Sequence, residues 1–228
     1  MRFAPPTLSA ALAAVILLAA PSALGAPEAK PPTRPQVSVS GKPPRGKAVA
    51  SDPLLETEDL IRRGLYTEAI ASLDQIDPAA KGLDPARYHT LYGVACLYQS
   101  RYPEAKAHLS QAVALSEDPL LQLYLAQALF GMEDYNGAVA ALDRAGAEAE
   151  QNPAAHLLRS RCYWRLGDHG RALAVVEAAQ ARFPDRPEVR NQRVDYLLEL
   201  GLYQEAVAVS REDLERGDNP RAYVRLRS

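Results

Sequence analysis

The chain has 228 residues, of which 47% are hydrophobic and 24% are charged, and its formal net charge is -2. Disordered chains carry far fewer apolar residues and a larger charge imbalance, so this composition indicates a globular protein and disfavours a nucleic-acid binder of the usual basic kind. Only three Phe and one Trp accompany many Ala and Leu, which favours helices over strands.

Residues 1–25 have the features of a secretory signal peptide. Arg2 precedes an apolar run at about 8–20, and the small residues Ala23 and Gly25 precede a possible cleavage site. A membrane anchor is the alternative, but the apolar run is well below the roughly 20 residues that a spanning helix needs. We therefore expect cleavage after Gly25 and a periplasmic or secreted protein, which meets the membrane only through this transient segment.

Residues 26–50 form a Pro-rich basic arm. They contain six Pro, five Lys or Arg and one acidic residue, a net charge of +4. Such a segment cannot bury enough apolar surface to fold, so we expect it to be disordered. Residues 51–228 hold 20 basic and 27 acidic residues, a net charge of -7. Two interpretations of the arm stay open: a solvated tether, or a contact with an anionic cell-wall polymer or lipid headgroups.

From residue 51 onward the sequence repeats with a period of about 34 residues. Alanines separated by 36, 33, 34 and 34 residues mark the period: Ala69, Ala105, Ala138, Ala172 and Ala206. A ring residue stands three positions before each alanine: Tyr66, Tyr102, Tyr135, His169 and Tyr203. Glycine stands two positions before the ring in three units: Gly64, Gly167 and Gly201. These columns indicate five copies of one structural unit.

Each unit has the pattern of two antiparallel helices. Helix-period stretches such as 88–98 precede the glycine position, and others such as 103–115 follow it. Glycine can end a helix in the left-handed conformation, and the small alanine lets the second helix approach the first. Several prolines are expected to open units, where a missing N–H costs nothing: Pro53, Pro119, Pro153, Pro187 and Pro220. Pro85 is expected in a connection.

These columns resemble the tetratricopeptide repeat family. The run GLYQEA at 201–206 matches the second half of the family's motif, and the resemblance covers about residues 50–219. It implies an all-α fold, a right-handed superhelical solenoid of about five tetratricopeptide-like helix pairs at residues 51–219. Residues 220–228 would form a short C-terminal cap. Terminal units of solenoids often depart from the consensus because one side of them faces water. The fifth unit departs from it at Ser210, where an apolar residue is expected.

The sequence offers no catalytic constellation. It lacks a Gly-rich phosphate loop, a His-Glu-x-x-His motif and a nucleophile elbow, so we expect no enzyme activity and no cofactor. Its four His and two Cys do not stand at ligand spacing, so we expect no metal site. Cys96 and Cys162 lie two repeats apart, beyond the roughly 7 Å limit for a disulfide, and are expected to be buried and reduced.

The remaining candidate site is a surface. In a stack of such pairs the first helices line the concave side, and residues spaced 3, 4, 3 along them point into it. We predict a partner-binding groove formed by Leu123, Gln127, Phe130, Leu157, Arg161 and Trp164. Aromatic residues and Arg dominate binding hot spots. Alternatively, some of these side chains pack between neighbouring units. The Lys and Asn pattern with which tetratricopeptide domains grip a free C-terminal carboxylate is missing.

These features predict a non-enzymatic protein-protein interaction scaffold of the bacterial cell envelope, which binds a protein partner in the concave groove. The prediction rests partly on the family resemblance, because a solenoid supplies surface rather than chemistry. The alternative is an accessory or regulator of a cell-wall enzyme, whose basic arm contacts an anionic envelope polymer. No nucleic acid is expected among the partners.

Overall fold

The computed structural model describes residues 52–216, so the predicted signal peptide (1–25), basic arm (26–50) and C-terminal cap (220–228) lie outside the described residues. The described part is helical and contains no strand. Its helices are, in chain order, α2 (Leu54–Arg62), α3 (Tyr66–Leu73), α4 (Pro85–Tyr98), α5 (Tyr102–Leu115), α6 (Pro119–Gly131), α7 (Tyr135–Ala145), α8 (Ala147–Glu150), α9 (Pro153–Arg165), α10 (His169–Arg182), α11 (Pro187–Glu199) and α12 (Tyr203–Arg216).

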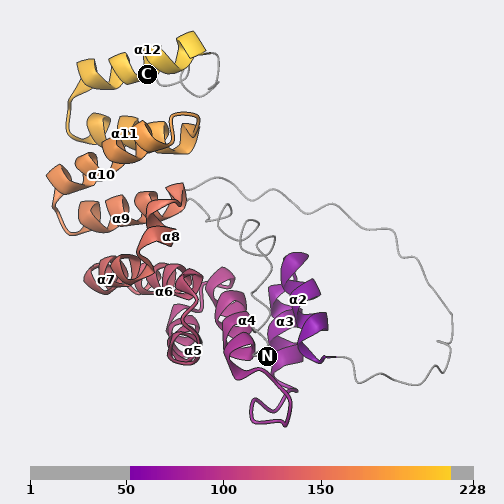
Figure 1. Ribbon diagram of the computed structural model, residues 1–228. Coiled ribbons are helices and arrows are strands. Elements are labelled where there is room, and N and C mark those ends of the chain that lie inside the picture. Colours follow the sequence, from indigo (N-terminus) through magenta and orange to yellow (C-terminus); the bar gives the residue numbers. More distant parts are fainter. Residues whose placement is uncertain (1–51, 217–228) are drawn as a thin grey trace, which may run out of the picture.

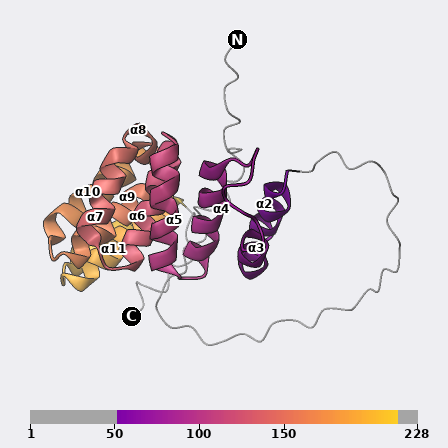
Figure 2. The ribbon, with the colours of Figure 1, turned by 90° about the horizontal axis from the view of Figure 1, so that it is seen from below.

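Ten of these helices form five antiparallel pairs, which confirms the predicted all-α, right-handed superhelical solenoid. The pairs stack in chain order from α2 and α3 at one end to α11 and α12 at the other (Figure 1). Seen from below, α2 and α3 form the end layer beside α4 (Figure 2). Each pair therefore contacts mainly the pairs before and after it, as expected for a repeat architecture.

The short helix α8 was not expected from the sequence. Gly146, with a φ of +53°, ends α7 after 11 residues, whereas α5 and α10 run for 14. The chain then makes one further turn, in which Ala149 is buried. A helix of four residues is too short to show a 3.6-residue period, so the repeat pattern carried no signal for it.

A proline is the first residue of the first helix in four pairs, and an Asp or Asn side chain caps three of these helices. Pro119, Pro153 and Pro187 are first residues of helices, as predicted. Pro85 is the first residue of α4, so its placement in a connection was wrong. The Asp84 carboxylate accepts a hydrogen bond from the backbone N–H of Ala86 at 3.0 Å, which caps the helix at this point. The cap and the fixed φ of proline together define where the helix begins.

The turn within each pair needs one residue in the left-handed conformation. Gly64, Gly167 and Gly201 have φ values of +73°, +79° and +73°, which confirms the predicted role of the glycine column. Ser100 and Glu133 occupy the same position in the other two repeats, with φ values of +58° and +63°. Because a side chain in this conformation crowds the following carbonyl oxygen, these two turns carry backbone strain that the glycine turns lack.

We expect Gly167→Ala to lower the free energy of unfolding by about 1 kcal/mol through backbone strain alone, because no atom lies within 4 Å of the added Cβ. Glu133→Gly should have the opposite sign. Urea denaturation of the purified protein measures both effects. Gly170→Ala, three residues on and inside α10, is the control and should stabilise through its better helix propensity. Equal effects of the two glycine replacements would contradict the assigned turn.

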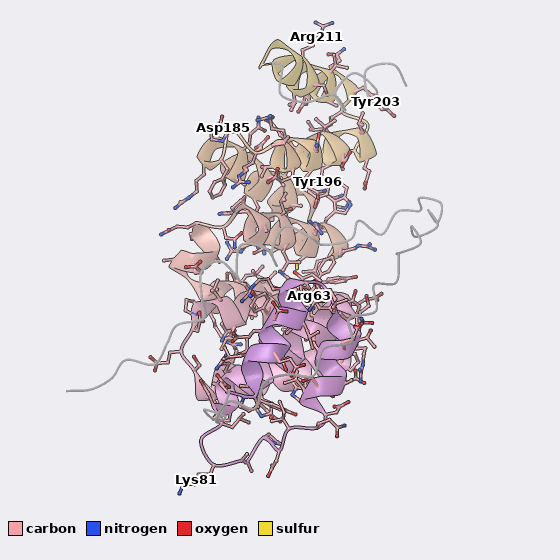
Figure 3. The ribbon with its side chains drawn as sticks, turned by 90° about the vertical axis from the view of Figure 1, so that its right-hand side faces the viewer. Arg63, Lys81, Asp185, Tyr196, Tyr203 and Arg211 are labelled. Atoms are coloured by element: carbon pink, nitrogen blue, oxygen red, sulfur yellow. The ribbon has the colours of Figure 1, made fainter. Side chains whose placement is uncertain are left out.

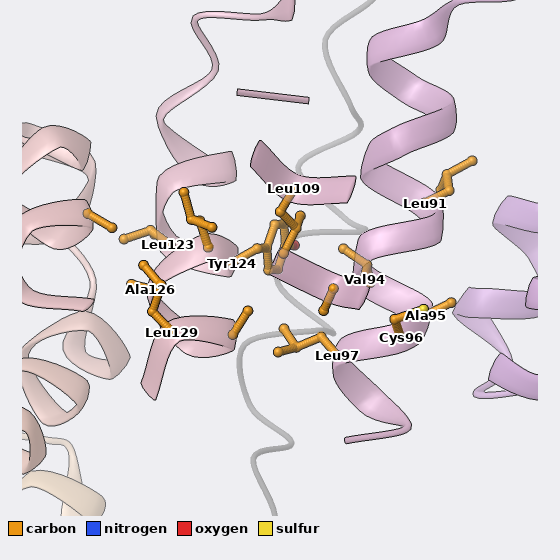
Figure 4. Close-up of a cluster of buried hydrophobic side chains, with 14 of the residues drawn as sticks. Leu91, Val94, Ala95, Cys96, Leu97, Leu109, Leu123, Tyr124, Ala126 and Leu129 are labelled. Atoms are coloured by element: carbon orange, nitrogen blue, oxygen red, sulfur yellow. The ribbon is translucent and has the colours of Figure 1, made fainter. Parts of the chain in front are cut away.

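The alanine column lies where the two helices of a pair cross. Its five alanines are at most 2% exposed: Ala69, Ala105, Ala138, Ala172 and Ala206. Large apolar side chains four residues later are fully buried in four repeats: Leu73, Leu109, Leu142 and Val176. Leu109 packs against Gly93, where an added Cβ would lie only 2.6 Å from its Cγ. Figure 4 shows side chains of α4, α5 and α6 converging in this layer of the core.

Replacing Ala172 by Leu places extra methylene groups at a helix crossing where the alanine is already fully buried. We expect a loss of about 1 to 3 kcal/mol in the free energy of unfolding. Ala174→Leu is a matched control, because Ala174 lies two residues further along the same helix and is exposed. Thermal or urea denaturation measures the difference, and an equal response of the two variants would refute the assigned crossing.

Candidate protein-binding groove

The first helix of each pair lies on the inner side of the stack. Helices α4, α6, α9 and α11 contact the first helices of the pairs next to them. The second helices pack mainly on their own partner and on the first helix that follows. In a curved stack, the helices of neighbouring repeats lie closer to one another on the concave side than on the convex side. The first helices therefore line the concave side. The six predicted groove residues lie on two neighbouring first helices, α6 and α9.

Two of the six predicted residues do not line a groove. Leu123 is 1% exposed and belongs to the core cluster that α4, α5 and α6 share. Leu157 is 7% exposed and packs in a second cluster with Val176, Val189 and others. The prediction that these leucines form part of the binding surface was wrong. Packing within the core covers both side chains, and Leu157 lies against residues of α10 as well as of α11.

The two predicted aromatic residues are half-buried. Phe130 packs partly against the core, with its ring centroid 5.4 Å from that of Tyr135. Trp164 is stacked between two rings, with centroid distances of 4.0 Å to Tyr196 and 4.3 Å to His169. Tyr196 comes from α11 and is labelled in Figure 3. The indole therefore connects the fourth repeat to the fifth, and only part of its surface is open to a partner.

The two polar residues of the predicted groove, Gln127 and Arg161, are also half-buried. They occupy equivalent positions 34 residues apart, on α6 and α9. Burial lowers the pKa of the Arg161 guanidinium, which keeps its charge because an arginine titrates far above neutral pH. The surface that remains from the prediction thus consists of Gln127, Phe130, Arg161 and Trp164, and these four are called the groove residues below.

A histidine pair was not predicted. His89 of α4 and His108 of α5 place their Nδ1 atoms 3.0 Å apart. Tyr92 stacks on the His108 ring at 4.0 Å, and its hydroxyl donates a hydrogen bond to the Asp74 carboxylate at 2.7 Å. In the sequence, His89 stands 11 residues before the turn at Ser100 and His108 stands 8 residues after it. This spacing places the histidines on paired helices but about one turn out of register, so the sequence carried no direct signal for their contact.

The histidine pair makes the stability of the second repeat depend on pH. Burial lowers the pKa of both imidazoles below the ordinary 6.5, and His89 lowers that of His108 further. Arg101 also lowers the pKa of His108, whereas Glu104 and Asp74 raise it. The unfolded chain therefore binds protons more readily than the folded chain at and below pH 6.5. By linkage, the folded state loses stability as the pH falls through this range.

We expect the free energy of unfolding to decrease between pH 7 and pH 5 in the wild-type protein, by up to about 1.4 kcal/mol per pH unit for each proton taken up. His108→Phe retains a ring on Tyr92 but removes one titrating group and the contact between the imidazoles. Its stability should fall less steeply over the same range. Urea titrations at several pH values measure the two slopes, and identical slopes would show that the pair does not control the pH response.

The structure places both cysteines in the core. Cys96 and Cys162 are free and buried, which confirms the prediction. Burial raises the pKa of the Cys96 thiol to about 11 and that of Cys162 to about 12, so both are protonated at neutral pH and poor nucleophiles. Within residues 52–216, no three or more His, Cys, Asp or Glu side chains gather into a possible metal site. None of the helices in this range is long and apolar enough to span a membrane.

Comparison with known proteins identifies the repeat. A tetratricopeptide repeat family model matches residues 93–153, 123–187 and 163–219, which together cover more than half of the chain. No curated protein matches.

Several solved structures share the fold. A thermophilic tetratricopeptide repeat protein of Thermus thermophilus, TTC0263, is 20% identical, with 77% of this chain and 98% of that chain covered and a TM-score of 0.57. MamA is 20% identical, with 71% and 94% covered and a TM-score of 0.61. A double mutant of MamA from RS-1 is 16% identical, with 76% and 99% covered and a TM-score of 0.62. At these identities the likeness concerns the fold alone.

Proposed function

Because the chain belongs to the tetratricopeptide repeat family, we propose that it is a non-enzymatic scaffold that binds one protein partner on the concave side of its repeats. The observation that carries the proposal is the set of groove residues on α6 and α9: two half-buried rings, one amide and one guanidinium on adjacent first helices. Such a mixture of aromatic and Arg side chains is typical of binding hot spots.

We further propose that the protein acts in the bacterial cell envelope. The support is in the sequence: Arg2, an apolar run and the small residues Ala23 and Gly25 follow one another in the order of a secretory signal peptide. Fractionation of the producing cells, with blotting for the chain, tests this location. Cytoplasmic protein of full length would contradict it.

A second function is favoured by the opposite charges of the arm and the body. Residues 26–50 have a net charge of +4, and residues 51–228 one of -7. In this alternative, the arm binds an anionic wall polymer and the repeats hold a cell-wall enzyme. Deletion of residues 26–50 separates the two proposals. Loss of sedimentation with cell-wall sacculi, while partner binding survives, favours the accessory role, and unchanged sedimentation favours the simple scaffold.

Site-specific crosslinking tests the groove. A photo-crosslinking amino acid at Gln127 should capture the partner in intact cells, whereas the same residue at Lys106 on the second helix α5 should not. Phe130→Ala should then weaken binding of the captured partner by about 2 kcal/mol, a factor of about 30, while Lys106→Ala has little effect. Titration calorimetry measures both affinities.

Trp164 needs a milder change because it stacks on Tyr196 and His169. Trp164→Phe keeps an aromatic ring in the stack, so it should weaken binding with little loss of helicity. Circular dichroism of each variant separates a lost contact from a lost fold. Capture from Lys106 but not from Gln127 would place the binding surface on the second helices and overturn the proposal.

A further inference from the structure

Among residues 52–216, no acidic side chain compensates the positive charge of Arg161. Its Nε atom is buried and has no hydrogen-bond acceptor. Its two Nη atoms also lack an acceptor within residues 52–216, and they are not among the buried unsatisfied atoms, so they reach the surface. The groups that act electrostatically on the guanidinium are Tyr196 and Cys162, neither of which is charged at neutral pH. Asp195, at the equivalent place on α11, is not one of them.

Other half-buried arginines of the first helices are compensated. Arg87 of α4 donates to Glu58 at 2.6 Å and also to Asp52. Arg159 of α9 pairs with Glu150 at 2.9 Å and Asp143 at 3.1 Å. Arg193 of α11 pairs with Glu177 at 2.9 Å and donates to the Gln180 side chain. Arg159 is only two residues from Arg161 but points to the other side of the helix, where acidic residues are available.

An uncompensated guanidinium with a buried stem is costly to the folded protein. Removing a charge from water is repaid only when an opposite charge or several acceptors meet it. Here the terminal nitrogens, which form the planar fork suited to a carboxylate, are the part left at the surface. The neighbouring residues on the same helix are Leu157, which is buried, and Trp164, which is half-buried. Trp164 stands three residues after Arg161 on α9, so an aromatic side chain lies on the same face of this helix.

We propose that Arg161 is the charge anchor of the partner: it binds the side-chain carboxylate of an Asp or Glu within a peptide segment that packs an apolar neighbour on Phe130 and Trp164. This inference rests on the proposed function and specifies the chemistry of the partner. A carboxylate held by two parallel N–H···O bonds supplies the charge that Arg161 lacks and fixes the register of the segment.

The carboxylate belongs to a side chain rather than to a free C-terminus. Arg161 lies on α9, which has first helices on both sides, α6 before it and α11 after it. The inner surface thus continues in both directions from the anchor. A segment can pass over Arg161 with neighbours on either side, and nothing at this position requires the partner chain to end.

Random 12-residue peptides displayed on phage, selected on residues 26–228, provide the test. We expect wild-type protein to enrich Asp or Glu next to an aromatic or aliphatic residue. A selected peptide, synthesised as the C-terminal amide, should lose affinity about tenfold when its acidic residue becomes Gln or Asn, as expected for a lost charge-assisted pair. Arg161→Met should bind both peptides equally, and Arg161→Glu should select Lys or Arg instead.

A measurement on the free protein is independent of any peptide. Arg161→Met keeps the length of the apolar stem and removes the uncompensated charge, so it should raise the melting temperature. Arg159→Met is the matched control, because it breaks two ion pairs on the same helix and should lower the melting temperature. A fall in both variants would show that Arg161 is already satisfied in the free protein and would overturn the inference.

The outcomes separate this inference from the proposed function. Peptides that need Phe130 but show no acidic preference, or one that Arg161→Met leaves unchanged, overturn the role of Arg161 alone. Peptides that bind only with a free C-terminal carboxylate also overturn it, since the amide would then be inactive. If no peptide is enriched, or if Phe130→Ala changes nothing, both the inference and the groove proposal fail.

Discussion

The close crossing of two helices at an alanine is the constraint on which the rest of the solenoid depends. At each crossing the alanine is at most 2% exposed, and in four of the five repeats a large apolar side chain from one turn later is fully buried beside it. At Gly93 the helices are so close that even an added methyl group would collide with Leu109. Once the pair is closed in this way, its other faces can pack against neighbours and the stack can extend.

The column of rings joins one layer to the next in a similar way. Tyr66 stacks on Tyr98 of the next pair at 4.8 Å, and the ring of Tyr102 lies over Gly131, where no Cβ would fit. Tyr203, at the far end of the described stack, is 65% exposed (Figure 3). Within residues 52–216 no first helix follows α12, so Tyr203 is open where Tyr66 and Tyr102 pack against the next pair.

The concave surface consists of the first-helix side chains that the packing between helices does not cover. A first helix uses most of its circumference to contact its partner and two neighbours, so few of its positions reach solvent. Leu123 and Leu157 are buried in these contacts. Trp164 is stacked against Tyr196 and His169 and is only partly exposed. Arg161 remains as a charged group whose stem is packed and whose fork is not. Because few side chains of the first helices stay exposed, the surface is small, and a few side chains would provide most of the binding energy.

The sequence by itself determined the repeat, the five helix pairs and the closely packed columns, because period, proline position and the need for a small residue are local properties of the chain. It also indicated that both cysteines are buried. It could not show which residues of the concave stripe are covered: Leu123 and Gln127 both belong to the predicted stripe, but Leu123 is buried and Gln127 is half-buried. The tertiary structure decided that, as it decided the contact between His89 and His108 and, within residues 52–216, the lack of a carboxylate beside Arg161. These features depend on distances between helices, and a period along the chain carries no information about them.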